Sequence, residues 1–395
     1  MNKWILFFSV TLSMVLPAKA QQILPVENYL TQRSGLPHTS YKLSEKQACT
    51  VAFLGGSITF NPGWRNKICR YLTERFPDTR FRFIAAGIPS LGSLPHAFRL
   101  QRDVLDSGSV DLLFMEAAVN DRANTTDSIT QVRALEGIVR HARISNPLMD
   151  IILMSFADPD KTSIYSHGQV PAEVANHEMV AVHYQLPSVN LAKEVHDKIE
   201  NNEFDWNKDF KDLHPSPFGQ DLYFTSLKKL LELTLVSNYS DRLKVPLPRP
   251  LDSASFTSGS YLAIPTAKTD NGWHFDADWA PADGLATRPG FVHVPVLSAV
   301  KAGATLSLNF KGTAIGIAVL SGQDAGIVSY SIDNSPYKEI DLYTPWSSQL
   351  HLPWYILFDG NLKSGAHLLK IKVASSHNPQ SKGNACRIVY FFKNQ

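Results

Sequence analysis

The feature that most constrains the fold is a change of sequence pattern near residue 250. Before it, from Val51 to Leu235, short apolar runs alternate with stretches of helical periodicity. Continuous apolar runs separated by helices predict a parallel sheet that is covered by helices on both faces. After it the helical pattern stops, and short strand-like runs are separated by turn signals. We therefore expect an α/β domain followed by an all-β domain.

These sequence patterns give the expected strands and helices of both domains. In the first, the expected strands are Val51–Leu54, Phe81–Ala86, Leu112–Glu116, Ile151–Met154 and Pro187–Leu191. The expected helices there are Asn66–Phe76, Ser128–Ser145, Pro171–Tyr184 and Phe218–Leu235. In the second, the expected strands are Thr305–Phe310, Ala314–Leu320, Gly326–Ile332, His367–Val373 and Arg387–Phe392. Short strands without helices predict a β-sandwich or jelly roll.

The first 20 residues have the composition of a secretory signal. Lys3 supplies the positive charge, residues 4–16 form an apolar core, and Ala18 and Ala20 provide a small-residue cleavage site. We expect an exported protein, periplasmic or extracellular, with no membrane span. The expected parts are a signal peptide (1–20), a lead-in (21–47), the α/β domain (48–240), a proline-rich linker (241–252) and the β-sandwich (253–395).

Composition limits the kinds of molecule that the protein is expected to bind. The chain has 38 Lys and Arg against 36 Asp and Glu, a formal charge of +2, so no basic excess indicates nucleic-acid binding. Cys49, Cys69 and Cys386 are too few for a disulfide framework and are not spaced as metal ligands. We expect Cys49 and Cys69 to be buried thiols, with a bridge between them as the weaker alternative. No metal or other cofactor is expected.

The first indication of a catalytic site is the sequence Gly55-Gly56-Ser57, which follows the first expected strand. Two glycines permit a sharp turn, so that the serine projects at the carboxyl end of a parallel strand, where ligands bind in such sheets. Ser57 is thus a candidate nucleophile, although such a turn can also serve only to join a strand to a helix.

Three later positions could complete a site around that serine. Gly87 follows the second strand, Asn120 follows the third, and His214 precedes the last helix of the domain. Each has an ordinary structural explanation in a turn, a helix cap or a surface loop. Their joint occurrence, at strand ends and in a loop before a helix, supplies a nucleophile, a base and two oxyanion donors.

In these motifs the sequence resembles the SGNH hydrolases of the GDSL superfamily. The first block is Gly55-Gly56-Ser57-Ile58, with Gly56 where the family has aspartate, and the third is Ala118-Val119-Asn120-Asp121, with alanine where the family has glycine. Gly87 matches the second block, and His214-Pro215 matches the last. The resemblance covers roughly residues 49–235.

The resemblance implies a three-layer α/β/α sandwich and a set of residue roles. It makes Ser57 the nucleophile and His214 the base. The Ser57 and Gly87 N–H groups and the Asn120 side chain become the oxyanion donors. The family's aspartate lies three residues before the histidine, a position that is Lys211 here, whereas the acid of this chain is Asp212. We take Asp212 as the first candidate for orienting His214; a backbone carbonyl is the alternative, which would leave a Ser–His dyad.

Two further features concern the substrate. Trp64 and Arg65 follow the nucleophile turn and are candidates for stacking on a sugar and for meeting an acidic group, although a core or capping role suits Trp64 equally well. The second domain resembles the jelly-roll accessory modules found beside carbohydrate esterases, in phrases such as Tyr330-Ser331-Ile332-Asp333-Asn334.

The sequence therefore predicts an exported serine esterase that removes acyl groups, in the first place acetyl, from a polysaccharide or oligosaccharide. A lipase or lysophospholipase of the same superfamily is the second hypothesis, although no strongly apolar insertion lies near the site. The third is a glycan-binding protein that has lost activity, which Gly56, Ala118 and Lys211 suggest and which intact Ser57 and His214 oppose.

Overall fold

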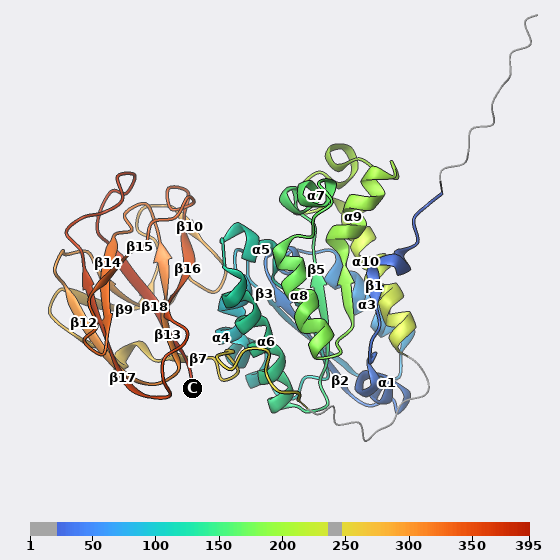
Figure 1. Ribbon diagram of the computed structural model, residues 1–395, viewed down its shortest axis with the longest axis horizontal. Helices are drawn as coiled ribbons and strands as arrows, with labels where there is room; N and C mark the ends of the chain where they lie inside the picture. Colours follow the sequence, from blue (N-terminus) through green and yellow to red (C-terminus); the bar gives the residue numbers. More distant parts are fainter. Residues whose placement is uncertain (1–21, 236–246) are drawn as a thin grey trace, which may run out of the picture.

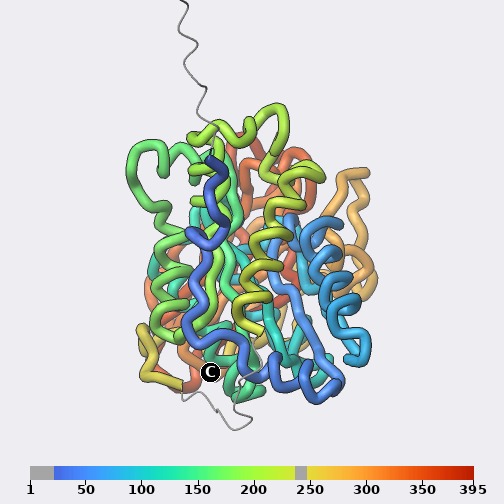
Figure 2. Tube along the Cα trace, turned by 90° about the vertical axis from the view of Figure 1, so that its right-hand side faces the viewer, coloured from blue at the N-terminus to red at the C-terminus, as the bar shows by residue number. Residues whose placement is uncertain are grey.

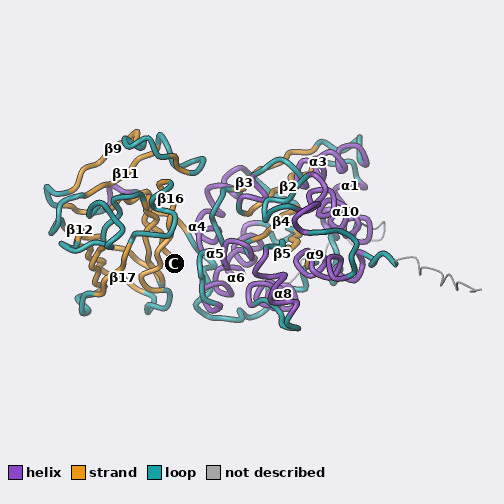
Figure 3. Tube along the Cα trace, turned by 90° about the horizontal axis from the view of Figure 1, so that it is seen from above, coloured by secondary structure: helices purple, strands orange, loops and turns teal. Residues whose placement is uncertain are grey.

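The computed structural model describes residues 22–235 and 247–395, and it divides them into an α/β domain and an all-β domain. Figure 1 shows the β-sandwich on the left and the helix-rich domain on the right. Seen from above, the purple helices gather around several orange strands in the right half, and the left half consists mainly of orange strands and teal loops (Figure 3). The predicted signal peptide and the first part of the predicted linker, residues 241–246, lie outside the described residues. Both predicted fold classes are confirmed.

A six-stranded sheet in the order β1-β6-β5-β4-β2-β3 forms the centre of the α/β domain. Strands β2 to β6 are parallel, and β1 is antiparallel at the edge. The strands are β1 (Leu30–Thr31), β2 (Cys49–Gly55), β3 (Phe81–Gly87), β4 (Leu112–Glu116), β5 (Asp150–Ser155) and β6 (Ser188–Asn190). The predicted strands are therefore present, and the fifth is shorter than predicted.

Helices cover both faces of this sheet and complete three layers. Ala52 and Leu54 of β2 pack under α4, α6 and α8, whereas Val51 and Phe53 pack under α1, α3, α9 and α10, because successive side chains of a strand point to opposite faces. The helices are α1 (Pro37–Ser44), α2 (Ser57–Phe60), α3 (Trp64–Arg75), α4 (Ser93–Asp103), α5 (Ala118–Ala123), α6 (Ser128–Ser145), α7 (Pro159–Ser166), α8 (Ala172–His183), α9 (Leu191–Glu200) and α10 (Pro217–Thr234). Short helical turns are η1 (Val26–Tyr29), η2 (Leu105–Ser107), the π-helical η3 (Trp206–Phe210) and η4 (Ile264–Thr266).

The N-terminal lead-in is more structured than the sequence suggests. It contains η1, β1 and α1, and it buries Leu36 and Leu43 in the core of the α/β domain. Figure 2 shows this segment in dark blue running down the domain, with η1 and β1 beside α10. The expectation of a surface lead-in is therefore wrong for residues 26–44, because the β1 edge strand completes the sheet against β6.

Two mainly antiparallel sheets make up the second domain. One has the order β10-β16-β13-β18-β11-β9 with β7 on β18, and the other has the order β15-β14-β17-β12-β8. The strands are β7 (Ser260–Leu262), β8 (Lys268–Thr269), β9 (Trp273–Trp279), β10 (Ala286–Thr287), β11 (Val294–Ala299), β12 (Thr305–Gly312), β13 (Ala314–Ser321), β14 (Ile327–Ile332), β15 (Lys338–Asp341), β16 (Leu350–Asp359), β17 (Gly365–Val373) and β18 (Cys386–Asn394). The predicted strands correspond to β12, β13, β14, β17 and β18. Within the first sheet β10 pairs with β16 in the parallel sense.

Helix α4 joins the two domains. The Phe98 ring lies 4.5 Å from the Phe392 ring and 5.2 Å from the Phe256 ring, so residues of both domains share one apolar core. Arg102 of the same helix stacks over Tyr261 and Tyr390 of the sandwich. This packing fixes the sandwich beside the α/β domain.

The described part of the predicted linker packs against the α/β domain. Pro248 O accepts a hydrogen bond from Arg140 at 2.8 Å, and the Glu136 carboxylate accepts the N–H groups of Leu251 and Asp252 at 2.6 and 2.9 Å. A glycine at position 137 of α6 permits the next part of the chain to approach, because a Cβ there would lie 2.7 Å from the Phe256 backbone. Among the described residues, none of the helices has the length and apolar character that a membrane span requires.

Candidate active site

The nucleophile turn connects β2 to the four-residue helix α2. Ser57 is the first residue of α2, and Gly56 precedes it as the N-cap. The helix is closed by hydrogen bonds from Phe60 N–H to Gly56 O at 2.9 Å and from Asn61 N–H to Ser57 O at 2.8 Å. Ser57 therefore stands at the carboxyl end of the central sheet, as the sequence predicts.

His214 lies in the loop between η3 and α10, and the structure brings it to Ser57. Its Nε2 is 2.8 Å from Ser57 Oγ, although the two residues are 157 positions apart in the chain. The loop is anchored by buried Phe210 and by Ser216, whose N–H donates to Phe210 O at 2.9 Å. A serine hydroxyl in contact with an imidazole is the pair that nucleophilic catalysis requires.

Asp212 lies beside His214 but meets its backbone. The carboxylate accepts the His214 N–H at 3.4 Å, and in residues 22–235 and 247–395 no acceptor is hydrogen-bonded to His214 Nδ1. Lys211, at the position of the family's acid, has φ 77° and turns the chain in the left-handed region. The geometry is therefore that of a Ser–His pair, with Asp212 supporting the loop.

Asn120, on α5 after β4, points its side-chain amide at the nucleophile turn. A Cβ built on Gly56 would lie 1.9 Å from Asn120 Nδ2, so the amide occupies the space of a side chain at position 56. The departure from the family's aspartate at Gly56 thus has a local reason in this structure. Asn120 and Ser57 line one cavity with His214.

Gly87 is less favourably placed than the sequence suggests. It ends β3 in register with Gly55, a Cβ there would lie 2.5 Å from Phe60 N, and it is not among the residues that line the cavity. Ser90 lines the cavity instead, and its φ of 71° belongs to the turn that Leu91 N–H closes on Ile88 O. Proline before it, at position 89, is the sequence signal for such a turn, since Pro favours the position before a residue with positive φ.

Trp64 and Arg65 do not reach the cavity, which corrects their prediction as substrate-binding residues. Trp64 is fully buried between the Phe53, Phe114 and Phe156 rings, and its Nε1–H donates to Ile58 O at 3.2 Å. Arg65 Nε–H donates to Thr59 O at 3.0 Å. Both therefore satisfy carbonyls of α2 and hold the nucleophile turn from behind.

The β-sandwich forms one wall of the cavity, so it flanks the candidate site, which is one of the two roles that the sequence suggests for it beside glycan binding. The cavity measures about 420 Å³. Arg288, Trp346 and Leu352 of the sandwich line it together with Ser57, Asn61, Pro89, Ser90, Val119, Asn120, Ala123, Asn124, Leu213 and His214. Arg288 Nε–H donates to Ser90 Oγ at 3.1 Å across the domain boundary. No local motif places these three residues at the site, because strand β16 and the loops beside β10 and β16 meet the cavity only through tertiary packing.

Two buried carboxyl groups hold the helices beneath the cavity. Asp121 accepts the N–H and the hydroxyl of Ser93 at 2.8 and 2.9 Å, and so ties α5 to the start of α4. Glu116 accepts Val119 N–H at 3.1 Å. Burial raises the pKa of Asp121 to about 7, and burial also raises the pKa of Glu116 to about 7. Buried Arg99, on α4, donates to Ala86 O and Gly55 O at the ends of the adjoining strands.

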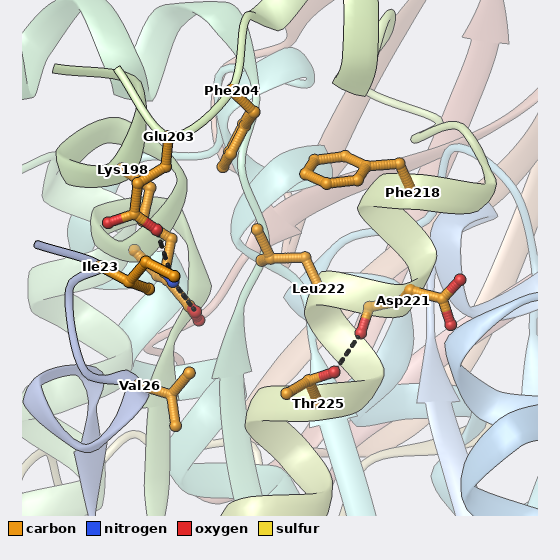
Figure 4. Close-up of a pocket in the computed structure, with 10 residues that line it drawn as sticks. Ile23, Val26, Lys198, Glu203, Phe204, Phe218, Asp221, Leu222 and Thr225 are labelled. Carbon is orange, nitrogen blue, oxygen red and sulfur yellow. Dashed lines mark hydrogen bonds and ion pairs between the residues drawn. The ribbon is translucent and has the colours of Figure 1, made fainter. Parts of the chain in front are cut away.

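A second cavity of about 420 Å³ lies between η1, α9 and α10 (Figure 4), and the described residues that line it include no serine–histidine pair. Ile23, Val26, Phe204, Phe218 and Leu222 form its apolar walls. At one side Lys198 bonds the Glu203 carboxylate at 3.1 Å. The described residues that line it include no serine, cysteine or histidine. In the described part of the chain, no group of three His, Cys, Asp or Glu side chains is arranged to hold a metal ion, and Cys49, Cys69 and Cys386 are free.

Comparison with known proteins finds a family match for the α/β domain and a likeness in fold for the whole described chain. Residues 53–222 match the GDSL-like Lipase/Acylhydrolase family. Two crystal structures of a two-domain esterase (CEX) active on acetylated mannans, one co-crystallized with mannopentaose, match with a TM-score of 0.75. The matches cover 94% of this chain and 98% of theirs, at 19% and 20% sequence identity, so that the likeness extends over both domains and concerns the fold. Among curated proteins, none matches the sequence. The α/β domain of this chain is a GDSL-like lipase/acylhydrolase domain, and it is followed by a β-sandwich.

Proposed function

We propose that this protein is a serine esterase that removes acetyl groups from a polysaccharide or oligosaccharide. The observation that carries the proposal is the 2.8 Å contact between Ser57 Oγ and His214 Nε2 in a cavity that both domains line. The likeness in fold to an esterase active on acetylated mannans supports a substrate of the same class.

In the proposed reaction, neutral His214 accepts the Ser57 proton at Nε2 while Oγ attacks the ester carbonyl. The protonated imidazole then gives that proton to the sugar oxygen as its bond to the carbonyl carbon breaks, so the sugar leaves with a free hydroxyl and an acetyl-serine remains. Water, deprotonated by His214, attacks the acetyl-serine; as the bond to Ser57 Oγ breaks, the imidazolium returns the proton to Oγ and acetate is released. Since Nε2 must accept a proton, the neutral ring carries its hydrogen on Nδ1.

Three donors are proposed for the oxyanion: the N–H groups of Ser57 and Ser90 and the side-chain amide of Asn120. Ser90 is proposed in place of Gly87 because it lines the cavity and lies in a positive-φ turn. Removing one donor of this kind typically costs on the order of 3 kcal/mol of transition-state stabilisation.

The walls of the cavity favour a short acyl group on a sugar over a long acyl chain. Asn61, Ser90, Ala123 and Asn124 are small or polar side chains, which suit a hydrated glycan. Trp346 is partly exposed at the cavity and offers a face for stacking on a sugar ring. A lipase would need a larger apolar surface here.

The test compares wild type with Ser57→Ala on p-nitrophenyl acetate, p-nitrophenyl palmitate and acetylated mannan, with acetate release measured for the last. We expect wild type to hydrolyse the acetyl substrates and Ser57→Ala to lose this activity. Turnover of only the palmitate would favour a lipase. Glycan binding without turnover by either protein would favour an inactive glycan-binding protein, and persistent turnover by Ser57→Ala would refute the assignment of the nucleophile.

Export is also proposed, from the charged, apolar and small-residue segments of residues 1–20. Expression of the full chain followed by N-terminal sequencing of the recovered protein tests it. A mature N-terminus near residue 21 is expected, whereas retention of Met1 in cell-associated protein would contradict export.

A further inference from the structure

Arg288 brings a positive charge into the cavity from the β-sandwich. Of the described residues that line the cavity, only Arg288 and His214 have ionisable side chains, and none is acidic. An anionic ligand would therefore meet no like charge on these walls, and it would meet a guanidinium close to the nucleophile.

The Arg288 guanidinium has no carboxylate partner. In residues 22–235 and 247–395, its side chain makes one hydrogen bond, from Nε to Ser90 Oγ at 3.1 Å, and no ion pair. Arg387 of the same domain differs, because it forms a two-pronged pair with Asp324 at 2.7 and 2.7 Å. Burial alone lowers the pKa of Arg288, which indicates a partly desolvated charge without a counter-ion.

The backbone around Arg288 is held in place before any ligand binds. Arg288 directly follows β10, whose Thr287 pairs with His351 of β16 and donates its hydroxyl to His351 O at 2.7 Å. Phe291 N–H then donates to Arg288 O at 3.1 Å. A guanidinium carried on such a rigid segment loses little conformational freedom when it binds a planar anion, and its two terminal nitrogens suit a carboxylate.

We infer that Arg288 binds a carboxylate of the substrate, so that the preferred substrate is an acetylated glycan containing uronate residues. The inference rests on the proposed esterase function and adds the charge of the substrate to it. The hydrogen bond between Arg288 and Ser90 places the carboxylate site beside the oxyanion donors. The carboxylate would then belong to the acetylated sugar or to one next to it.

The test uses acetylated galacturonan oligosaccharides and the same oligosaccharides with their carboxylates methyl-esterified, which removes the charge and leaves the sugar. For wild type, kcat/KM for acetate release should be about 10- to 100-fold higher for the acidic form, the range expected of a charged hydrogen-bonded pair. In Arg288→Gln this ratio should fall to about 1, and Arg288→Lys should retain part of it. Lys301→Gln, which removes an exposed charge of the sandwich outside the cavity lining, is the matched control and should keep the wild-type ratio.

A measurement on wild type alone makes the test independent of how the variants fold. Trigalacturonate should inhibit hydrolysis of p-nitrophenyl acetate at a concentration at least about tenfold lower than mannotriose does. Equal inhibition, equal turnover of the acidic and methyl-esterified forms, or an unchanged ratio in Arg288→Gln would overturn the inference, and neutral sugar hydroxyls would then be the partners of Arg288. If wild type hydrolyses no acetyl ester at all, the proposed function fails first, which separates the two results.

Discussion

The two domains contribute different things to one cavity. The α/β domain supplies Ser57, His214 and Asn120, whereas the β-sandwich supplies Arg288 and Trp346. The first set stands at strand ends and on the loop before α10, where the sheet dictates position. Arg288 and Trp346 lie on loops that are positioned by the packing of α4 against the sandwich and by the pairing of β10 with β16. In the proposed esterase the reacting groups follow from the α/β topology, and the proposed substrate-binding surface follows from how the domains pack.

The largest expected effect tests the chemical side of this division. His214→Ala should lower kcat on p-nitrophenyl acetate by about 10⁴-fold, because Ser57 loses its base. Asp212→Asn should lower it by less than about tenfold, since the carboxylate meets the His214 backbone and not the ring. A collapse in Asp212→Asn as deep as in His214→Ala would mean that Asp212 turns to Nδ1 during the reaction. Steady-state kinetics of both variants decide between a dyad and a triad.

A second prediction concerns the fit between the nucleophile turn and α5. Gly56→Ala should lower kcat by about 10²- to 10³-fold. The new methyl group would lie 1.9 Å from Asn120 Nδ2, so it would displace the amide from its place beside the nucleophile turn. Asn120→Ala should have a similar effect, and the double variant should be little worse than either single one. Gly365→Ala, where a Cβ meets nothing within 4 Å, is the control. Additive losses would show that Gly56 and Asn120 act separately.

A third prediction tests the substrate-facing wall. Trp346→Ala should lower kcat/KM for acetylated polysaccharide, relative to that for p-nitrophenyl acetate, by about 3- to 10-fold through loss of sugar stacking. Tyr337→Ala removes an aromatic side chain of the sandwich that is 55% exposed and outside the cavity, so it should leave the ratio unchanged. If Trp346→Ala keeps the wild-type ratio, the sandwich encloses the cavity but Trp346 does not bind the glycan.

The smallest expected effect concerns stability beneath the cavity. Because burial raises the pKa of Asp121 to about 7, folding favours its protonated form. The resulting stabilisation is fully present below the pKa of the unfolded state and is lost as the pH rises through about 7. Between pH 5 and pH 8, the free energy of unfolding should therefore decrease less in Asp121→Asn than in wild type, by on the order of 1 kcal/mol.

Urea denaturation at the two pH values measures this difference. Asp160→Asn, an acid whose side chain is 64% exposed, is the control and should follow wild type. Equal slopes for wild type and Asp121→Asn would mean that Asp121 is already ionised in the folded protein at pH 5.

Much of the α/β domain could be predicted from sequence because its signals are local. The apolar runs of β2 to β6 and the helical periodicity of α3, α6, α8 and α10 place Ser57, Asn120 and His214 at one edge of the sheet. Helix α4 escaped prediction, in part because Arg99 within it is fully buried and breaks the expected apolar face. Its buried charge is satisfied by the Asp103 carboxylate at 2.7 Å and by strand-end carbonyls, partners that only the fold reveals.

The site was harder to predict where a residue's direction matters. Trp64 and Arg65 adjoin the nucleophile in sequence, but α3 turns the Trp64 ring into the core, and both side chains bond the carbonyls of α2. Gly87 and Ser90 are three residues apart, and the turn after β3 decides which of them lines the cavity. Arg288 has no sequence signal, and nothing in the sequence distinguishes Trp346 from the other tryptophans of the sandwich, because the place of both depends on the domain interface.

Helix α4 also bears on whether the hydrolase can be used as a separate module. Phe98 fits against Phe256 and Phe392, and a glycine at position 137 is shaped to receive the chain that leads into the sandwich. A version cut after residue 235 would leave that aromatic surface facing water, where it would promote association between molecules. Evolution and protein engineering often exchange accessory domains freely between enzymes. In this protein, replacement of the sandwich would also require an α4 that matches the new domain. We therefore expect the two domains to be retained together.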